Sequence, residues 1–150
     1  IPNSYFLLKN TLSQSNIDDY EEYRGSKIKG IELIEDQFRR SLNTFIDLSL
    51  AWGTEPILMT QFNRINLEDE LFNKISSSII NKEEYVESYT RLNDVIREVS
   101  VSRNVDLIDL ANLIPSSSNY IYDSVHLNEN GSKLAAEILT DYWLKKLELQ

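Results

Sequence analysis

Two short apolar runs constrain the fold of this chain more than any other feature. The first is the ILMT run within the segment from Glu55 to Gln61, and the second is the VDLIDL segment from Val105 to Leu110. Each run is too short to be a helix, and neither has the strict apolar–polar alternation of a strand with one face in water. Such runs are typical of strands that a parallel sheet buries on both faces. The sequence therefore predicts an α/β protein.

Helical patterns flank and separate the two runs. Apolar residues recur at helical spacing over residues 31–50, and Gly53 then marks the end of that helix. A second helix is predicted over Lys82–Arg103, and a third begins after the capping residue Asn128 and runs to about residue 147. The order helix, strand, helix, strand, loop, helix is the alternation expected of a parallel α/β sheet.

Two predicted strands do not complete a sheet. A sheet covered on both faces needs roughly three or more strands, and the sequence offers no convincing third. Residues 63–80 are predicted to form a loop with a short helix, and Tyr5–Leu12 a short amphipathic helix. The chain also opens with Ile1 and has Met59 as its only methionine. We therefore expect residues 1–150 to be the C-terminal part of a single domain, whose remaining strands come from preceding polypeptide or a complementary chain.

Charge and composition argue against several classes of function. The chain has 15 Lys and Arg residues against 24 Asp and Glu residues, and the net charge of −9 disfavours binding to a nucleic-acid backbone. No apolar run approaches the length that spans a bilayer. The absence of cysteine removes disulfides, thiolate catalysis and zinc–thiolate sites but leaves the compartment open. We expect neither a nucleic-acid partner nor a transmembrane segment.

The single histidine of the chain, His126, follows an aspartate by three positions. Asp123 and His126 lie after the second predicted strand and just before the helix that Asn128 caps. Open α/β sheets bind ligands in the loops beyond the carboxyl ends of their strands. A carboxylate at this spacing can hold one imidazole N–H and leave the other ring nitrogen as a base. A purely structural interpretation is also open, in which His126 is a partly buried loop residue that leads into a helix.

The residues around this pair resemble the last sequence block of the SGNH, or GDSL-type, hydrolases. The block reads YDSVHLNENGSKLA, from Tyr122 to Ala135. More loosely, the segments EPILMTQ and YVESYTRLNDVIREVSVSRNVDLIDLANLIP resemble the family's fourth strand and its next helix and strand. The resemblance implies a three-layer α/β/α, flavodoxin-like fold and a Ser-His-Asp catalytic triad. In that triad His126 is the general base and acid, Asp123 is its orienting partner, and no cofactor is needed.

The family's other catalytic blocks are absent from this chain. Its nucleophilic serine lies in a Gly-Asp-Ser block after the first strand, and its oxyanion-hole glycine and asparagine lie in two further blocks. Gly25-Ser26 lacks a preceding apolar strand, and Ser116-Ser117-Ser118 is better interpreted as a solvated turn. We therefore expect the serine to come from a missing N-terminal part or a partner chain, and the isolated chain to be inactive.

Other polar residues near the predicted strands are weaker candidates. Gln61 and Asn63, just past the first strand, are candidates for substrate binding in the cleft, and capping of loop backbone explains them equally well. Asp106 and Asp109 could pair as catalytic carboxylates, but acids at strand ends more often cap backbone or face solvent. The Asp-x-x-His pair lacks a third and fourth metal ligand, so we expect no metal site.

Two functional hypotheses follow. The first is a serine esterase, lipase-like enzyme or other acyl hydrolase, whose substrate is an ester of a lipid, a glycan or a small molecule; the sequence does not choose among them. The second is a non-catalytic α/β binding or assembly module, with glycans as one candidate ligand, in which the Asp-x-x-His turn has a structural role. A Gly-Asp-Ser block after an upstream apolar strand would favour the enzyme.

Overall fold

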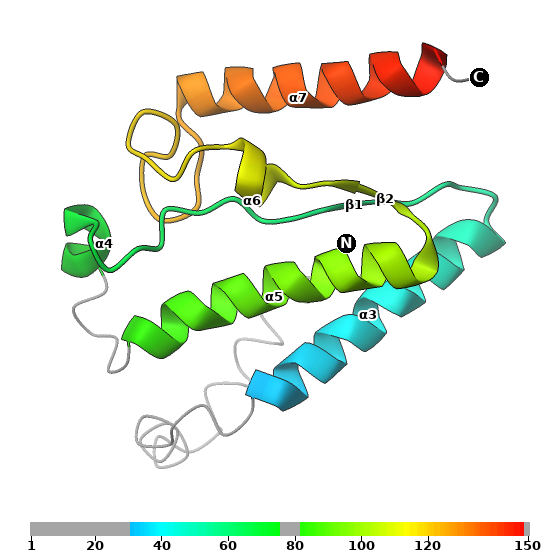
Figure 1. Ribbon diagram of the computed structural model, residues 1–150, viewed down its shortest axis with the longest axis horizontal. Helices are drawn as coiled ribbons and strands as arrows, with labels where there is room; N and C mark the ends of the chain where they lie inside the picture. Colours follow the sequence, from blue (N-terminus) through cyan, green and yellow to red (C-terminus); the bar gives the residue numbers. More distant parts are fainter. Residues whose placement is uncertain (1–30, 76–81, 149–150) are drawn as a thin grey trace, which may run out of the picture.

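The computed structural model of the protein describes residues 31–75 and 82–148, and the helix expected over Tyr5–Leu12 lies outside them. The elements follow in the order α3 (Ile31–Ala51), β1 (Ile57–Met59), α4 (Glu70–Ile75), α5 (Lys82–Arg103), β2 (Asp106–Ile108), α6 (Leu110–Leu113) and α7 (Glu129–Glu148) (Figure 1). The three long helices and both strands predicted from the sequence are present. The short helix α6 was not predicted, because its first residue belongs to the apolar run assigned to the second strand.

The two strands pair in parallel, with Leu58 directly opposite Leu107. The chain passes from β1 to β2 through α4 and α5, because parallel neighbours need a long crossover connection. Within the described residues the sheet consists of these two strands. The structure is therefore a mixed α/β arrangement with a parallel sheet, as the sequence predicted.

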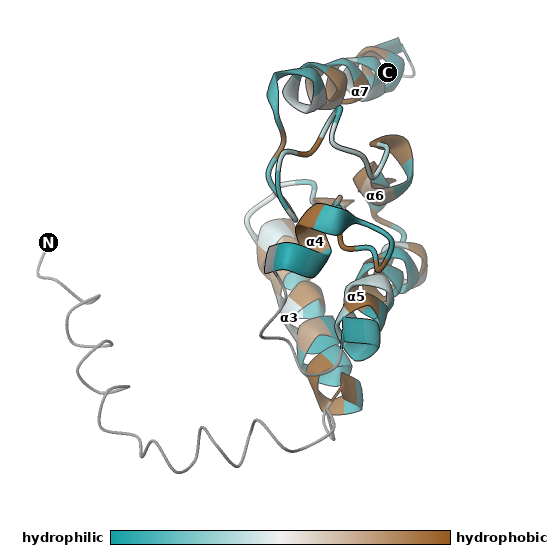
Figure 2. Ribbon diagram, turned by 90° about the vertical axis from the view of Figure 1, so that its left-hand side faces the viewer, coloured by the Kyte–Doolittle hydropathy of each residue, from teal (hydrophilic) through white to brown (hydrophobic). Residues whose placement is uncertain are grey.

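Helices cover both faces of this small sheet. α3 and α5 lie on one face and α7 on the other, and Figure 2 shows the same layers from the side on which the strands end. The buried core on the α5 side consists of Ile46, Leu58, Val95, Ile96 and Val99. The buried core on the α7 side consists of Ile108, Leu110, Ile114 and Ile121, with part of α7 packed against it. Neighbouring strand residues thus point to opposite layers, as strand geometry requires.

The helices that precede the two strands end in left-handed residues. After α3, Gly53 has a φ of 69°, and the N–H of Thr54 donates to the carbonyl oxygen of Ser49 at 2.9 Å. After α5, Asn104 has a φ of 50°. Glycine adopts this conformation without steric cost, and asparagine tolerates it better than most residues. Both ends follow the Schellman pattern, which stops the helix and turns the chain toward the next strand.

Large apolar side chains remain on the surface of α3 and α7. Trp52, just past the end of α3, is 85% exposed. The exposed large apolar residues within the two helices are Leu33, Ile34, Phe45, Leu48, Leu50, Trp143, Leu144 and Leu147. Apolar surface of this kind is typical of faces that contact another polypeptide or ligand. None of the described helices combines the length and apolar character needed to cross a membrane.

Candidate functional site

The loop between α6 and α7 folds back on itself as a short antiparallel hairpin. Ile121 bridges Leu127, and the N–H of Tyr122 donates to the carbonyl oxygen of His126 at 3.0 Å. Side chains alternate in direction along paired segments, so Ile121 and Leu127 face the core while Tyr122 and His126 face solvent. Ile121 is fully buried, whereas the His126 side chain is 66% exposed. The alternating sequence thus presents the imidazole at the surface.

Asp123 organises the turn of this hairpin with both carboxylate oxygens. Its Oδ1 accepts the backbone N–H groups of Val125 at 2.8 Å and His126 at 2.9 Å, and its Oδ2 lies 2.8 Å from Nδ1 of His126. These two backbone N–H groups, with a smaller contribution from the imidazole, lower the pKa of Asp123 from 3.8 to about 2. The carboxylate is therefore ionised at neutral pH and can only accept hydrogen bonds, which places the shared proton on Nδ1.

The imidazole of His126 is consequently oriented as a base. With Nδ1 protonated, the lone pair of Nε2 can accept a proton. Among the described residues Asp123 is the hydrogen-bond partner of the ring, and no serine hydroxyl of residues 31–75 or 82–148 bonds to it. The ring of Tyr122 stacks on the imidazole, with ring centroids 5.7 Å apart and planes inclined by 24°. The carboxylate–imidazole contact expected from the Asp-x-x-His spacing is present.

Asn128 and Gly131 attach the hairpin to the start of α7. The side chain of Asn128 accepts the N–H of Gly131 at 3.0 Å, as a helix N-cap does, and donates to the carbonyl oxygen of Ser118 at 3.0 Å. The N–H of Asn128 donates to the carbonyl oxygen of Tyr120 at 2.9 Å. A Cβ atom on Gly131 would lie 2.1 Å from that carbonyl oxygen, so glycine is required for this close approach.

Arg64 connects the hairpin to the segment that leaves β1. Its N–H donates to the carbonyl oxygen of Ser124 at 2.8 Å, its Nη1 donates to the carbonyl oxygen of Ile121 at 3.3 Å, and its Nε pairs with Asp69. The side chains of Arg64 and Asp69 are 12% and 14% exposed. Burial raises the pKa of Asp69, but the N–H of Phe72 and the guanidinium of Arg64 together lower it below 3.8. The ion pair therefore fixes the Arg64 side chain, and the bonds from Arg64 to Ser124 and Ile121 hold the hairpin against the segment that leaves β1.

The side chains of Gln61 and Asn63, the predicted substrate-binding residues, bond to nearby backbone. The Nε2 of Gln61 donates to the carbonyl oxygen of Phe62 at 2.9 Å, and the Oδ1 of Asn63 accepts the N–H of Ile65 at 3.1 Å. The backbone N–H and carbonyl oxygen of Gln61 both bond to the amide of the buried Asn93, at 2.8 and 2.9 Å. Gln61 and Asn63 thus have the loop-capping contacts that were the alternative to substrate binding.

The two strand acids have separate structural partners. Asp109, just past β2, accepts two bonds from Arg97, both at 2.9 Å, and one from the hydroxyl of Thr60 at 2.7 Å. The bonds from Arg97 lower the pKa of Asp109, although burial opposes this. Asp106, at the start of β2, accepts a bond from Lys146 at 2.7 Å, which lowers its pKa. The two carboxylates lie at opposite ends of the strand and do not form a catalytic pair.

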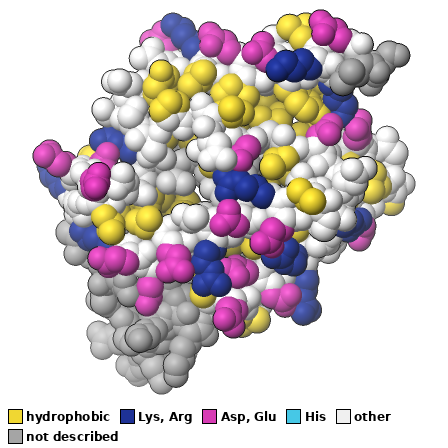
Figure 3. All heavy atoms as spheres, viewed as in Figure 1, with side chains coloured by type: hydrophobic (Ala, Val, Ile, Leu, Met, Phe, Trp, Pro, Cys, Tyr) yellow, Lys and Arg dark blue, Asp and Glu magenta, His cyan; other side chains and the backbone are white. Residues whose placement is uncertain are grey.

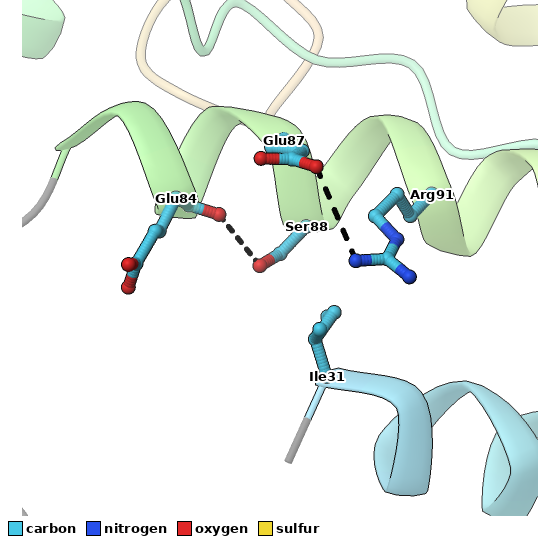
Figure 4. Close-up of a pocket in the computed structure, with 5 residues that line it drawn as sticks. All are labelled: Ile31, Glu84, Glu87, Ser88 and Arg91. Atoms are coloured by element: carbon cyan, nitrogen blue, oxygen red, sulfur yellow. Dashed lines mark hydrogen bonds and ion pairs between the residues drawn. The ribbon is translucent and has the colours of Figure 1, made fainter. Parts of the chain in front are cut away.

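A surface depression lies between the start of α3 and the first turns of α5. Figure 4 shows its lining residues, Ile31, Glu84, Glu87, Ser88 and Arg91. The hydroxyl of Ser88 donates to the carbonyl oxygen of Glu84 at 2.6 Å, and Arg91 donates to Glu35 at 3.2 Å. The bond of Ser88 lies within α5 and that of Arg91 joins α5 to α3, and the depression does not include His126.

A second depression follows the edge of β2 beneath α7, where Figure 3 shows exposed hydrophobic side chains. Leu113, Ile138 and Tyr142 supply apolar lining, and Asp141 and Lys145 of α7 also line it. It too excludes His126. The described residues contain no group of three or more His, Asp or Glu side chains that could hold a metal ion.

Comparisons with known proteins do not identify a family. No protein-family model, curated protein or solved structure matches the chain. What the hairpin can do chemically therefore follows from its own geometry.

Proposed function

We propose that the protein acts in ester hydrolysis and supplies the histidine and aspartate of a Ser-His-Asp triad. The observation that carries this proposal is the 2.8 Å contact between Nδ1 of His126 and Oδ2 of Asp123 on an imidazole that is 66% exposed. The pair lies in a loop beyond the carboxyl ends of two parallel strands, where α/β proteins bind their ligands. Its carboxylate is ionised, its imidazole is tethered at Nδ1, and no described residue forms a hydrogen bond with Nε2.

In this function Nε2 of His126 takes the proton of a serine hydroxyl as the serine oxygen attacks the ester carbonyl carbon. The ionised Asp123 stabilises the imidazolium that forms. Nε2 then returns the proton to the departing alcohol, which leaves an acyl-enzyme. A water molecule hydrolyses the acyl-enzyme, with His126 acting again as base and then as acid.

The serine and the oxyanion donors are proposed to lie outside these 150 residues, in the N-terminal part of an SGNH-type domain or in a complementary chain. The completed domain would be a flavodoxin-like α/β/α sandwich. Two observations support an incomplete sheet. The described sheet has two strands, with the side chain of Met59 in β1 49% exposed, and large apolar side chains on α3 and α7 face solvent.

A non-catalytic binding or assembly module is the second candidate, and the backbone bonds on Asp123 favour it specifically. The Oδ1 of Asp123 holds the turn through two N–H groups, Asn128 caps α7, and Gly131 permits the close approach of loop to helix. Each of these three residues therefore has a structural role that requires no chemistry. In such a module the exposed ring of His126 would have no catalytic consequence.

Serine-directed labelling distinguishes the two candidates. In protein expressed from its full reading frame, we expect a fluorophosphonate probe to label a serine outside these 150 residues, and p-nitrophenyl butyrate to be hydrolysed. The variant His126→Ala should lower both rates about 10³-fold or more, because it removes the base that activates the serine.

The matched control is Lys133→Ala. Lys133 lies on α7, close to the hairpin in sequence, and its side chain is 67% exposed. Among the described residues its ion-pair partner is Glu129, one turn earlier in the same helix. This variant should keep wild-type labelling and turnover. Equal turnover in His126→Ala and wild type, or a labelled serine that is independent of His126, would exclude the triad and leave the binding module.

A further inference from the structure

We infer that Tyr122 is a positioning residue that sets the plane of the His126 imidazole. Its catalytic consequence rests on the proposed function, but its structural part does not. Tyr122 and His126 face each other across the hairpin next to the Ile121–Leu127 bridge, and the N–H of Tyr122 donates to the carbonyl oxygen of His126 at 3.0 Å. Directly opposed residues of an antiparallel pair have neighbouring side chains on the same face. The backbone pairing therefore places the phenol ring of Tyr122 beside the imidazole of His126.

The two rings are stacked and largely exposed. Their centroids are 5.7 Å apart and their planes are inclined by 24°, within the range of favourable offset stacking. Tyr122 is 58% exposed. A large aromatic side chain on the surface contributes little to the core, so burial does not account for its position. Its aromatic contact among the described residues is with His126.

The stacking supplies an orientation that the Asp123 bond does not. A single hydrogen bond at Nδ1 fixes one atom of the imidazole and leaves the ring able to tilt about that atom. The side chain of His126 is 66% exposed, so core packing does not restrain the tilt. The Nε2 lone pair lies in the plane of the imidazole. Stacking on the Tyr122 ring sets this plane, and it therefore sets the direction of the lone pair. Proton transfer depends steeply on such alignment.

Nuclear magnetic resonance on the 150-residue chain tests the structural part directly. His126 is the only histidine, so histidine labelled with ¹³C and ¹⁵N gives a single imidazole spin system. We expect wild type and Tyr122→Phe to show one side-chain rotamer for His126, high ring order parameters and Overhauser contacts between the two rings. Tyr122→Leu should show averaged couplings and lower order parameters. The backbone amide signals of Val125 and His126, which report the Asp123 turn, should be preserved in all three.

Esterolysis tests the catalytic part. In protein expressed from its full reading frame and assayed on p-nitrophenyl butyrate, Tyr122→Leu should lower kcat about 2- to 10-fold with little change in KM. Tyr122→Phe, which keeps the aromatic ring, should have the kcat of wild type. Unchanged His126 couplings and order parameters in Tyr122→Leu would overturn the inference even if turnover depends on His126. If His126→Ala leaves turnover unchanged while Tyr122→Leu loosens the ring, the proposed function fails and the positioning role stands.

Discussion

The backbone N–H of Arg64 donates to the carbonyl oxygen of Ser124 at 2.8 Å. This bond joins the exit of β1 to the hairpin that carries Asp123 and His126, and the bond from Arg64 to the carbonyl oxygen of Ile121 reinforces it. The candidate site is therefore built from two segments that are far apart in sequence. Its local part is the carboxylate–imidazole pair, and the position of this pair relative to the sheet depends on the two bonds from Arg64 to the hairpin.

Removal of the Arg64 side chain should destabilise the protein strongly. In Arg64→Ala the nearly buried carboxylate of Asp69 loses its cation, and the carbonyl oxygen of Ile121 loses a donor. We expect a loss of about 2–4 kcal/mol in the free energy of unfolding, measured by urea denaturation. The control is Arg40→Ala, whose pair with Asp36 is at the surface, with Arg40 77% exposed, and should cost at most about 0.5 kcal/mol. Similar losses of unfolding free energy in the two variants would contradict a stabilising role for the Arg64 contacts.

Two carboxylates that bind the same guanidinium should differ in their effect on stability. Asp109 accepts bonds from Arg97, Thr60 and Asn112, so Asp109→Ala leaves several donors unpaired and should cost about 2–4 kcal/mol. Asp94 pairs with Arg97 at 2.7 Å but is 52% exposed, so Asp94→Ala should cost less than about 1 kcal/mol. Thermal and urea unfolding measure both. The reverse order would show that Asp109 does not join the strand ends to α5.

Replacing each of the two described glycines by alanine should lower the free energy of unfolding by different amounts. At Gly131 a Cβ atom would lie 2.1 Å from the carbonyl oxygen of Tyr120, so Gly131→Ala must displace the hairpin from α7. We expect a loss above about 2 kcal/mol despite alanine's higher helix propensity. At Gly53 the space is open but φ is 69°, so Gly53→Ala should cost about 1 kcal/mol through backbone strain alone. Chemical-shift changes at Asp123 and His126 should accompany the first substitution and not the second.

The titration of Asp123 should hardly depend on its histidine. The largest causes of its lowered pKa are the backbone N–H groups of Val125 and His126, which remain in His126→Ala. We therefore expect the ¹³Cγ signal of Asp123 to titrate near pH 2 in wild type and still clearly below 3.8 in the variant. A return to 3.8 would show that the imidazole, and not the turn, holds the carboxylate ionised.

The same shift has a defined effect on stability against pH. Because the pKa of Asp123 is lower in the folded protein, its ionised form stabilises the fold at pH values above its unfolded pKa, 3.8. That contribution is lost as the pH falls from 3.8 through about 2, where the folded carboxyl takes up its proton. The protection of the Val125 amide against exchange, relative to its unfolded rate at the same pH, should fall in this window, and Asp123→Asn should remove the part of this pH dependence that comes from Asp123.

Much of the fold could be predicted from local patterns. Helical spacing identified α5 over Lys82–Arg103, the residues that form it in the structure, and Gly53 marked the end of α3. The Asp123–His126 contact was also predictable, because residues three apart in a tight turn lie close together. The role of Arg64 was not, since its partner Ile121 is 57 residues away and no periodicity reports such a contact.

The sequence by itself determined the three long helices, the two strands and the carboxylate–imidazole pair, because spacing, capping residues and short turns act over a few positions of the chain. Only the tertiary structure decided that Asp109 is held by Arg97 and Thr60, and that Gln61 is held by Asn93. These contacts depend on how strands, helices and loop pack in three dimensions. A polar side chain takes the partner that packing brings within hydrogen-bond distance, and the residue type alone does not specify which partner that is.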